Sequence, residues 1–201
     1  MATDVIAPEQ VAAPYGGVRM TAEEFFNLPD DGYRYELVDG VVLATPSPSP
    51  RHQRVAHELT VQLASFLKAH PVGEMLYETD VHLGRGPDGT DLVYCPEIVF
   101  YRADRLAAMR DRLVGPPDLV VEVISPLTRR YDTQTKRDDY QRFGVREYWI
   151  VDAQRNEFIF LRNEGDAFVQ VPPTGDTFAS QAVEGFVLDL TQVRATFGPW
   201  S

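Results

Sequence analysis

Residues 117–126, PDLVVEVISP, contain the most informative pattern in the chain. The run from Leu119 to Ile124 is apolar except for Glu122, and it follows a Gly-Pro-Pro turn. A short apolar run of this kind is typical of a central β-strand that is covered on both faces. Because side chains alternate along a strand, Glu122 shares its face with Val120 and Ile124. The run therefore predicts a buried strand that carries one carboxylate.

The carboxylate of Glu122 needs an explanation in such a strand. An isolated buried carboxylate is costly, so it is normally paired, protonated or bound to a metal. The alternative is an edge strand with this face open to water, or a structural ion pair. Since neither Val120 nor Ile124 is polar, we interpret Glu122 as a candidate functional residue.

The residues after this strand predict a helix and further strands. Asp132 is the expected N-cap of a helix over 132–143, and Gly144 is its expected end. Residues 147–152, EYWIVD, predict the next strand. The C-terminal segments resemble antiparallel strands or a flap over one edge; they are 156–163, 168–171 and 183–190.

The residues before the strand predict a hairpin, three helices and two further strands. Thr21 and Glu24 have the spacing of a capping box at the start of a short helix. Asp39-Gly40 is a favoured two-residue turn between two strand-like runs. Apolar residues at helical spacing predict a helix over 51–69. Strand candidates are 75–83 and 96–101, and 103–113 suggests another helix.

This order of elements predicts a mixed α/β (α+β) domain. We expect one central mixed β-sheet flanked by helices, with an N-terminal hairpin and C-terminal antiparallel strands. A length of 201 residues suits a single domain over 20–201, preceded by a flexible tail over 1–19.

Composition and motifs exclude several classes of protein. No apolar run is long enough to cross a bilayer, so we expect no membrane association. The N-terminus lacks the pattern of a secretory signal, and the single cysteine, Cys95, does not call for an oxidising compartment, so the expected location is cytoplasmic. Zinc-binding H-E-x-x-H, phosphate-binding P-loop and G-x-S-x-G patterns are all absent from the sequence.

The net charge of −11 is unusual for a nucleic-acid enzyme, because phosphate binding needs basic residues. Residues 129–146 nevertheless have a local charge of +3, from six basic and three acidic side chains. From charge alone a solvated helix face is the favoured explanation, and the excess bears on function only if an active site lies beside it.

Lys136 and Tyr140 lie four residues apart on one face of the expected helix, and Phe143 follows at the next turn. The two aromatic rings should face the core, which places Lys136 at its margin. Lys136 then either extends over apolar surface into water or meets buried carboxylates, where it can stabilise developing charge on a phosphate.

Two more carboxylates occur in similar strands. Glu97 directly follows Pro96 at the start of one, and Glu36 lies in the first strand of the hairpin. Each alone is more typical of a solvated strand residue. Together with Glu122 they form an oxygen-rich ligand set of the kind that Mg²⁺ or Mn²⁺ prefers.

Taken in order, several motifs resemble the Uma-two-type family of proteins assigned as restriction endonucleases, within the PD-(D/E)XK superfamily. The resemblance covers about residues 20–170. The motifs that carry it are Tyr35–Gly40, Ser47–His52, Pro96-Glu97, Pro117–Pro126, the Asp132…Lys136…Tyr140 helix and Gly144–Asp152.

The resemblance implies a restriction-endonuclease-like core and metal-assisted phosphodiester hydrolysis. Glu97 and Glu122 would be metal ligands, with Glu36 as an extra carboxylate. Lys136 would replace a lysine that the superfamily usually carries on the strand, where this chain has Ile124. We also expect substrate contacts from four residues, namely His52, Arg129, Arg130 and Tyr140.

One residue departs from the family pattern. The family usually has Asp after the proline, whereas this chain has Glu97, whose carboxylate lies one methylene further from the backbone. Mg²⁺ demands near-ideal geometry, so this change bears on metal preference. The leading hypothesis is a Mg²⁺- or Mn²⁺-dependent DNA endonuclease that acts as a homodimer. The alternative is a nuclease-fold binding or regulatory module that no longer cuts. A toxin or defence component that needs a partner chain is a third hypothesis.

Overall fold

A computed structural model describes residues 13–107, 109–165 and 167–198. Of the tail expected over 1–19, residues 1–12 lie outside this part. Residues 13–19 form a turn whose Gly17 N–H donates to the Val42 carbonyl at 2.8 Å. The described chain divides into two compact units, one of residues 13–47, 80–95 and 112–115 and the other of the remainder.

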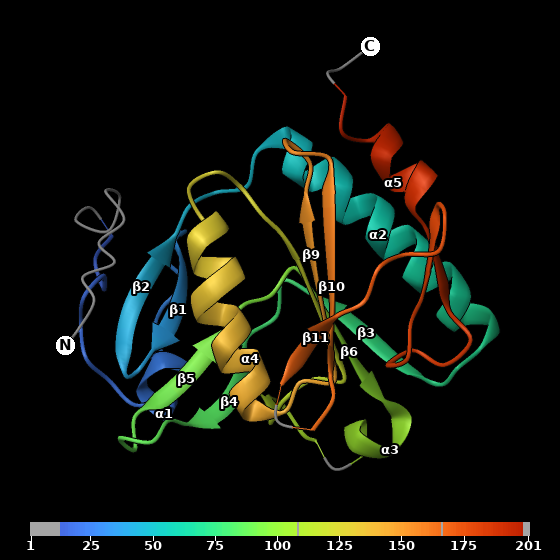
Figure 1. Ribbon diagram of the computed structural model, residues 1–201. Coiled ribbons are helices and arrows are strands. Elements are labelled where there is room, and N and C mark those ends of the chain that lie inside the picture. The colour runs from blue at the N-terminus through green and yellow to red at the C-terminus, as the bar shows by residue number, and fades with distance from the viewer. Residues whose placement is uncertain (1–12, 108, 166, 199–201) are drawn as a thin grey trace. The chain divides into compact units, whose positions relative to one another are not determined.

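A six-stranded mixed sheet forms the centre of the second unit (Figure 1). β8 and β9 run parallel, and the other neighbouring pairs are antiparallel. This sheet confirms the predicted fold class. In spatial order its strands are β11 (Phe168–Gln170), β10 (Glu157–Asn163), β9 (Glu147–Asp152), β8 (Leu119–Val123), β6 (Ile98–Arg102) and β3 (Gly73–Tyr77).

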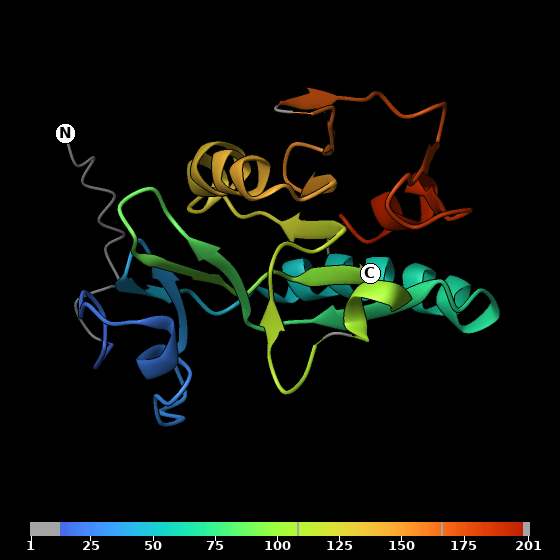
Figure 2. The same cartoon turned by 90° about the horizontal axis from the view of Figure 1, so that it is seen from below.

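Helix α2 (Pro50–Ala69) covers one face of this sheet, and it confirms the helix expected over 51–69 (Figures 1 and 2). Ser49 caps its N-terminus and Pro50 begins its first turn. Leu59 and Leu63 are fully buried in one cluster with sheet residues such as Val121. Burial of a side chain of this size stabilises the fold by about 1.5–3 kcal/mol.

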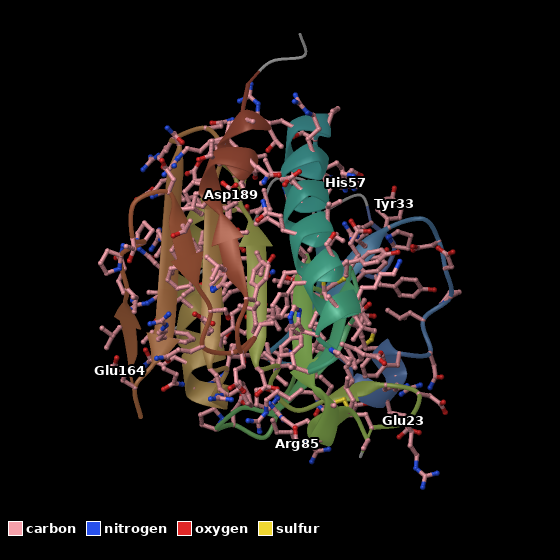
Figure 3. The ribbon with its side chains drawn as sticks, turned by 90° about the vertical axis from the view of Figure 1, so that its right-hand side faces the viewer. Glu23, Tyr33, His57, Arg85, Glu164 and Asp189 are labelled. Atoms are coloured by element: carbon pink, nitrogen blue, oxygen red, sulfur yellow. The ribbon has the colours of Figure 1, made fainter. Side chains whose placement is uncertain are left out.

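The C-terminal segment packs beside the same helix. β12 (Thr177–Ala179) and β13 (Val187–Asp189) form a two-stranded sheet, followed by α5 (Leu190–Ala195). The Gln62 side chain of α2 bonds both to the N–H and to the carbonyl of Asp189, which Figure 3 labels alongside the helix. These contacts attach the end of the chain to α2.

A π-helical segment, η1 (Tyr131–Lys136), and α4 (Arg137–Phe143) lie on the other face of the sheet (Figure 2). Gly144, at φ 84°, ends α4 as predicted. The expected N-cap at Asp132 is wrong, because helical backbone already begins at Arg129 and Asp132 lies buried inside it. Ser125 supplies the N-terminal bonds instead, accepting the Thr128 N–H on its hydroxyl and the Arg129 N–H on its carbonyl.

A five-stranded sheet forms the centre of the first unit, with α1 (Ala22–Phe25) packed on it. The predicted capping box of α1 is present. The predicted hairpin turn is present too, with positive φ at both Asp39 and Gly40. In spatial order the strands are β2 (Val41–Thr45), β1 (Arg34–Val38), β5 (Asp91–Tyr94), β4 (Val81–Arg85) and β7 (Leu113–Val114).

Two expected elements are corrected. Residues 75–83 are not one strand, because β3 ends at Tyr77 and β4 begins at Val81 in another sheet. Between them Glu78 has φ 48°, a conformation that interrupts extended backbone. The helix expected over 103–113 is limited to α3 (Ala103–Leu106), and Leu113 already belongs to a strand.

Candidate active site

The pairing of β6 with β8 brings Glu97 and Glu122 to one place in the second unit. The two strands are antiparallel, with Ile98 opposite Val121. Continuing this register by one residue puts the backbone of Glu97 next to Glu122, at the same end of the two strands. Glu97 itself lies in a bend before β6 begins, and its carboxylate contacts His52 of α2. The two glutamates, 25 residues apart in sequence, are therefore neighbours along the sheet, and a joint site is part of the proposal below.

Lys136 and Tyr140 reach the carboxylate of Glu122 from the helical segment η1–α4, which covers the other face of the sheet from α2. Lys136 Nζ lies 2.9 Å from Glu122 Oε1, and the Tyr140 hydroxyl donates to that oxygen at 3.1 Å. All three side chains are almost fully buried. The structure thus brings together three of the residues that the sequence singled out, and Glu122 is not a solvated edge residue.

The π-helical segment places a further carboxylate in this group. Asp132 Oδ1 lies 3.8 Å from Lys136 Nζ, and the Asp132 side chain is 6% exposed. The Tyr148 hydroxyl donates to the Asp132 backbone carbonyl at 3.1 Å. π-Helical turns within helices are frequent at functional sites. Sequence reasoning missed this role of Asp132, because an Asp before a helical pattern is also a common N-cap.

Glu122, Asp132 and Lys136 together have a formal charge of −1 when all three are ionised. Burying ionised groups costs several kcal/mol each, and that cost is offset only by good pairing. One ammonium facing two carboxylates leaves an excess of negative charge in a nearly dry environment. The arrangement is therefore suited to a further cation.

His52 approaches Glu97 from the first turn of α2. The Ser49 hydroxyl caps this turn by accepting the His52 N–H at 3.2 Å. His52 Nε2 then lies 2.7 Å from Glu97 Oε1, without hydrogen-bond geometry. The backbone carbonyl of Glu97 accepts the Glu78 N–H at 3.1 Å. The structure therefore joins the expected substrate residue His52 to the carboxylate that follows Pro96.

The two arginines expected to contact substrate have different surroundings. Arg129 is bound to Asp152 and, at 2.8 Å, to Glu157. The hydrogen bond that Arg129 donates to Glu157 is the main cause that raises the pKa of Arg129. Arg130 is exposed and donates to Gln134 at 3.1 Å. Substrate contacts by either arginine remain a prediction.

The local basic excess of residues 129–146 is largely used in ion pairs. Besides Arg129 and Lys136, Arg142 pairs with Asp139 at 2.8 Å and Arg146 lies 3.6 Å from the buried Asp118. Arg102 and Arg105 also approach Asp118. Much of the positive charge therefore stabilises the second unit itself.

Glu36 belongs to the first unit. It is 1% exposed, and it accepts the Cys95 N–H at 3.3 Å. Burial raises the pKa of the neighbouring Asp80, and the negative charge of Glu36 raises it further. The participation of Glu36 in the metal site stays a prediction.

The ligand set in the second unit fits a hard divalent cation. Among the described residues, no three His, Cys, Asp or Glu side chains are grouped as a ready metal site. Mg²⁺, however, is usually held by one or two carboxylates and keeps several waters. Glu122 supplies one such carboxylate, and Glu97, just before the paired strand β6, supplies a second. The chemistry of these residues therefore suits a hard divalent cation.

Comparisons with known proteins identify the family and a similar fold. A family described as "Uma2: Putative restriction endonuclease" matches residues 22–191. No match was found among curated proteins. A crystal structure from Anabaena variabilis, described as a putative nuclease belonging to DUF820, has a similar fold, with a TM-score of 0.72 and 16% sequence identity. The match covers 89% of this chain and 99% of that chain.

Proposed function

The chain belongs to the Uma2 family, and on this premise we propose that it is a metal-dependent endonuclease that hydrolyses phosphodiester bonds in DNA. The observation that carries the proposal is the buried pair of Lys136 Nζ and Glu122 Oε1, 2.9 Å apart, on the strand that pairs with β6 just after Glu97. This pair joins the expected acidic strand to the expected catalytic lysine, although the lysine comes from the following helix.

Each residue of the site has a defined task in this proposal. Glu97 and Glu122 would hold Mg²⁺ or Mn²⁺, which when bound polarises the phosphate and lowers the pKa of a bound water. Lys136 would stabilise the negative charge that develops on the phosphate oxygens. Tyr140 and Asp132 hold Lys136 and Glu122 in register from the helix side.

The proposal also covers the substrate and the assembly. Nucleic acid is the substrate class that the family implies, and DNA is the form we propose. No helix in the described part of the chain is long and apolar enough to cross a membrane. We also propose a homodimer, because two-fold assemblies are by far the commonest oligomers. Sedimentation that shows only monomer at micromolar concentration would contradict the dimer.

The direct test is cleavage of supercoiled plasmid and of short single-stranded DNA. Wild type and Glu122→Gln are incubated with Mg²⁺, with Mn²⁺ and with chelator. The proposal is supported if wild type cleaves DNA only when Mg²⁺ or Mn²⁺ is present and Glu122→Gln does not cleave it. The circular dichroism spectrum of Glu122→Gln must match that of wild type, to show that the variant is folded. Equal cleavage by both proteins would show that Glu122 does not belong to the chemistry.

A second candidate function is a nuclease-fold binding or regulatory module without activity. It is favoured by the net charge of −11 and by Glu97 in place of the family's Asp. This candidate predicts DNA binding without cleavage and no divalent-metal affinity at Glu97. Metal binding that is lost in Glu97→Ala would count against it.

A further inference from the structure

The first unit has a cavity of about 600 Å³ that the nuclease proposal does not use. Its walls include Phe26 and Asn27 after α1, His82 and Arg85 of β4, and Arg112 and Val114 at β7. Pockets that hold small organic ligands are usually about 300–1,000 Å³ and combine apolar walls with a few convergent polar groups. The cavity has the size and the mixed lining of such a pocket.

Asp91 organises the polar side of the cavity. It accepts the Ala22 N–H at 2.9 Å, and its other oxygen lies 3.1 Å from His82 Nε2 and 3.2 Å from Arg85 Nε. Burial alone would raise the pKa of Asp91, but these bonds outweigh burial and lower it. Asp91 is therefore an ionised, buried carboxylate that holds an imidazole and a guanidinium in fixed positions.

The side chains of the lining that can contact a ligand are mainly guanidinium groups and an aromatic ring. The Arg85 side chain is 69% exposed beyond its bond to Asp91. The Arg112 guanidinium lies over the Phe26 ring, with its central carbon 4.4 Å from the ring centroid. Val114, which is 56% exposed, adds an apolar surface. Glu23 is the one acidic side chain of the lining that is not buried, and Figure 3 labels both Glu23 and Arg85.

We propose that this cavity binds a small organic phosphate monoester with a flat ring, of the nucleoside monophosphate class. Guanidinium groups match phosphate oxygens in bidentate geometry, and Arg85 and Arg112 supply two of them. The stacked Arg112 and Phe26 offer a planar surface to a base, and His82, held by Asp91, forms part of the wall beside them. The negative charge of Asp91 is balanced by its hydrogen bonds to Ala22 N–H, His82 and Arg85, so Asp91 does not repel the phosphate.

The test is a calorimetric titration of the full chain with 5′-AMP in the presence of chelator. Chelator removes any phosphate binding that depends on a metal at Glu97 and Glu122. We expect saturable binding with a Kd below about 1 mM, and binding at least about tenfold weaker in Arg85→Gln and in Arg112→Gln. Arg155→Gln, which changes an equally exposed arginine of the second unit, is the matched control and should bind as wild type.

Further probes separate the contribution of the base from that of the phosphate, and binding of a free mononucleotide from binding of an oligonucleotide. Adenosine and inorganic phosphate should each bind more weakly than 5′-AMP, and Val114→Phe should weaken 5′-AMP by narrowing the cavity. Glu122→Gln should bind 5′-AMP normally, which keeps this result separate from the nuclease proposal. The inference is overturned if 5′-AMP does not bind, if both arginine variants bind it as wild type does, or if an oligonucleotide without terminal phosphate binds equally well through Arg112.

Discussion

Two buried glutamates of the second unit show how surroundings separate structural from chemical roles. Glu147 is fully buried, and its carboxylate accepts bonds from the Ser180 hydroxyl, two backbone N–H groups and Arg162. Such complete satisfaction by fixed donors is typical of a structural carboxylate. Glu122 instead contacts a lysine and a tyrosine, beside a second acid at Asp132. Of these two glutamates, Glu122 is the one that we propose as a ligand of a bound cation.

Replacing Lys136 tests the chemical role at this scale. Lys136→Gln removes the positive charge from beside the reacting phosphate, so we expect kcat to fall by about 10²–10³-fold with KM changed much less. Arg142→Gln, which removes an exposed ion pair from the same helix, is the control and should keep normal kcat. Steady-state kinetics with a fluorescent DNA substrate measures both constants.

Losing Lys136 also leaves two buried carboxylates without their ammonium, which is destabilising. Circular dichroism and thermal melting must therefore show that the variant is folded at the assay temperature. A folded Lys136→Gln protein with normal kcat would remove Lys136 from the catalytic group.

At the level of elements, the helix that carries Lys136 shows both the reach of sequence reasoning and its limit. The apolar run of β8, the i and i+4 spacing of Lys136 and Tyr140, and the end at Gly144 all follow from local patterns, and the structure has each of them. The π-helical segment does not follow from local patterns, because it depends on how Tyr131–Lys136 packs on the sheet. Asp132 was therefore expected as a cap at the helix start and is a buried partner of Lys136.

The same limit applies to β3 and β4. Their residues have one continuous strand-like pattern, but the backbone turns at Glu78 and the two strands enter different sheets. Strand partners far apart in the sequence decide this outcome, and local propensity does not report them. The pairing of β6 with β8, which brings the segment after Pro96 to the strand of Glu122, is a long-range result of the same kind.

Gly144 offers a test of the helix end. Its φ of 84° suits glycine, and a Cβ there would meet nothing within 4 Å. The cost of Gly144→Ala is therefore purely conformational, about 1–2 kcal/mol of the free energy of unfolding. Urea denaturation measures this cost. Ala195→Gly, in the short helix α5, is the comparison for a small backbone change at another helix. If the urea midpoint of Gly144→Ala equals that of wild type, the left-handed helix end is contradicted.

Asp91 offers a pH-dependent test of the contact between α1 and its sheet. Because the folded protein lowers the pKa of Asp91, the ionised carboxylate stabilises the fold at every pH above its ordinary value of 3.8. This contribution is lost as the pH falls from 3.8 through the lower pKa of the folded state. Asp91→Asn should cost about 1–3 kcal/mol at pH 7 and progressively less in that acid range.

Urea denaturation of wild type and Asp91→Asn at a series of pH values gives this difference directly. Asp189→Asn is the comparison, because Asp189 also has a lowered pKa but is bound by residues of its own helix turn. A difference for Asp91→Asn that stays constant down to pH 2.5 would contradict the assigned ionisation.

For the whole molecule, the net charge of −11 sets the conditions for nucleic-acid binding. Several basic residues that the sequence pointed to are held by carboxylates of the second unit. Long-range attraction to DNA is therefore weak, and a cation at the site would add positive charge next to the phosphate that reacts. The central claim is thus that Glu97 and Glu122 bind one divalent metal together.

Titration with Mn²⁺ by calorimetry, without DNA, tests that claim most directly. Wild type should bind Mn²⁺, and Glu97→Ala and Glu122→Gln should each lose this binding while keeping their folded circular dichroism. Glu157→Gln, which changes an acid that pairs with Arg129, is the control and should bind as wild type. If both site variants bind Mn²⁺ with wild-type affinity, the two carboxylates do not form a metal site.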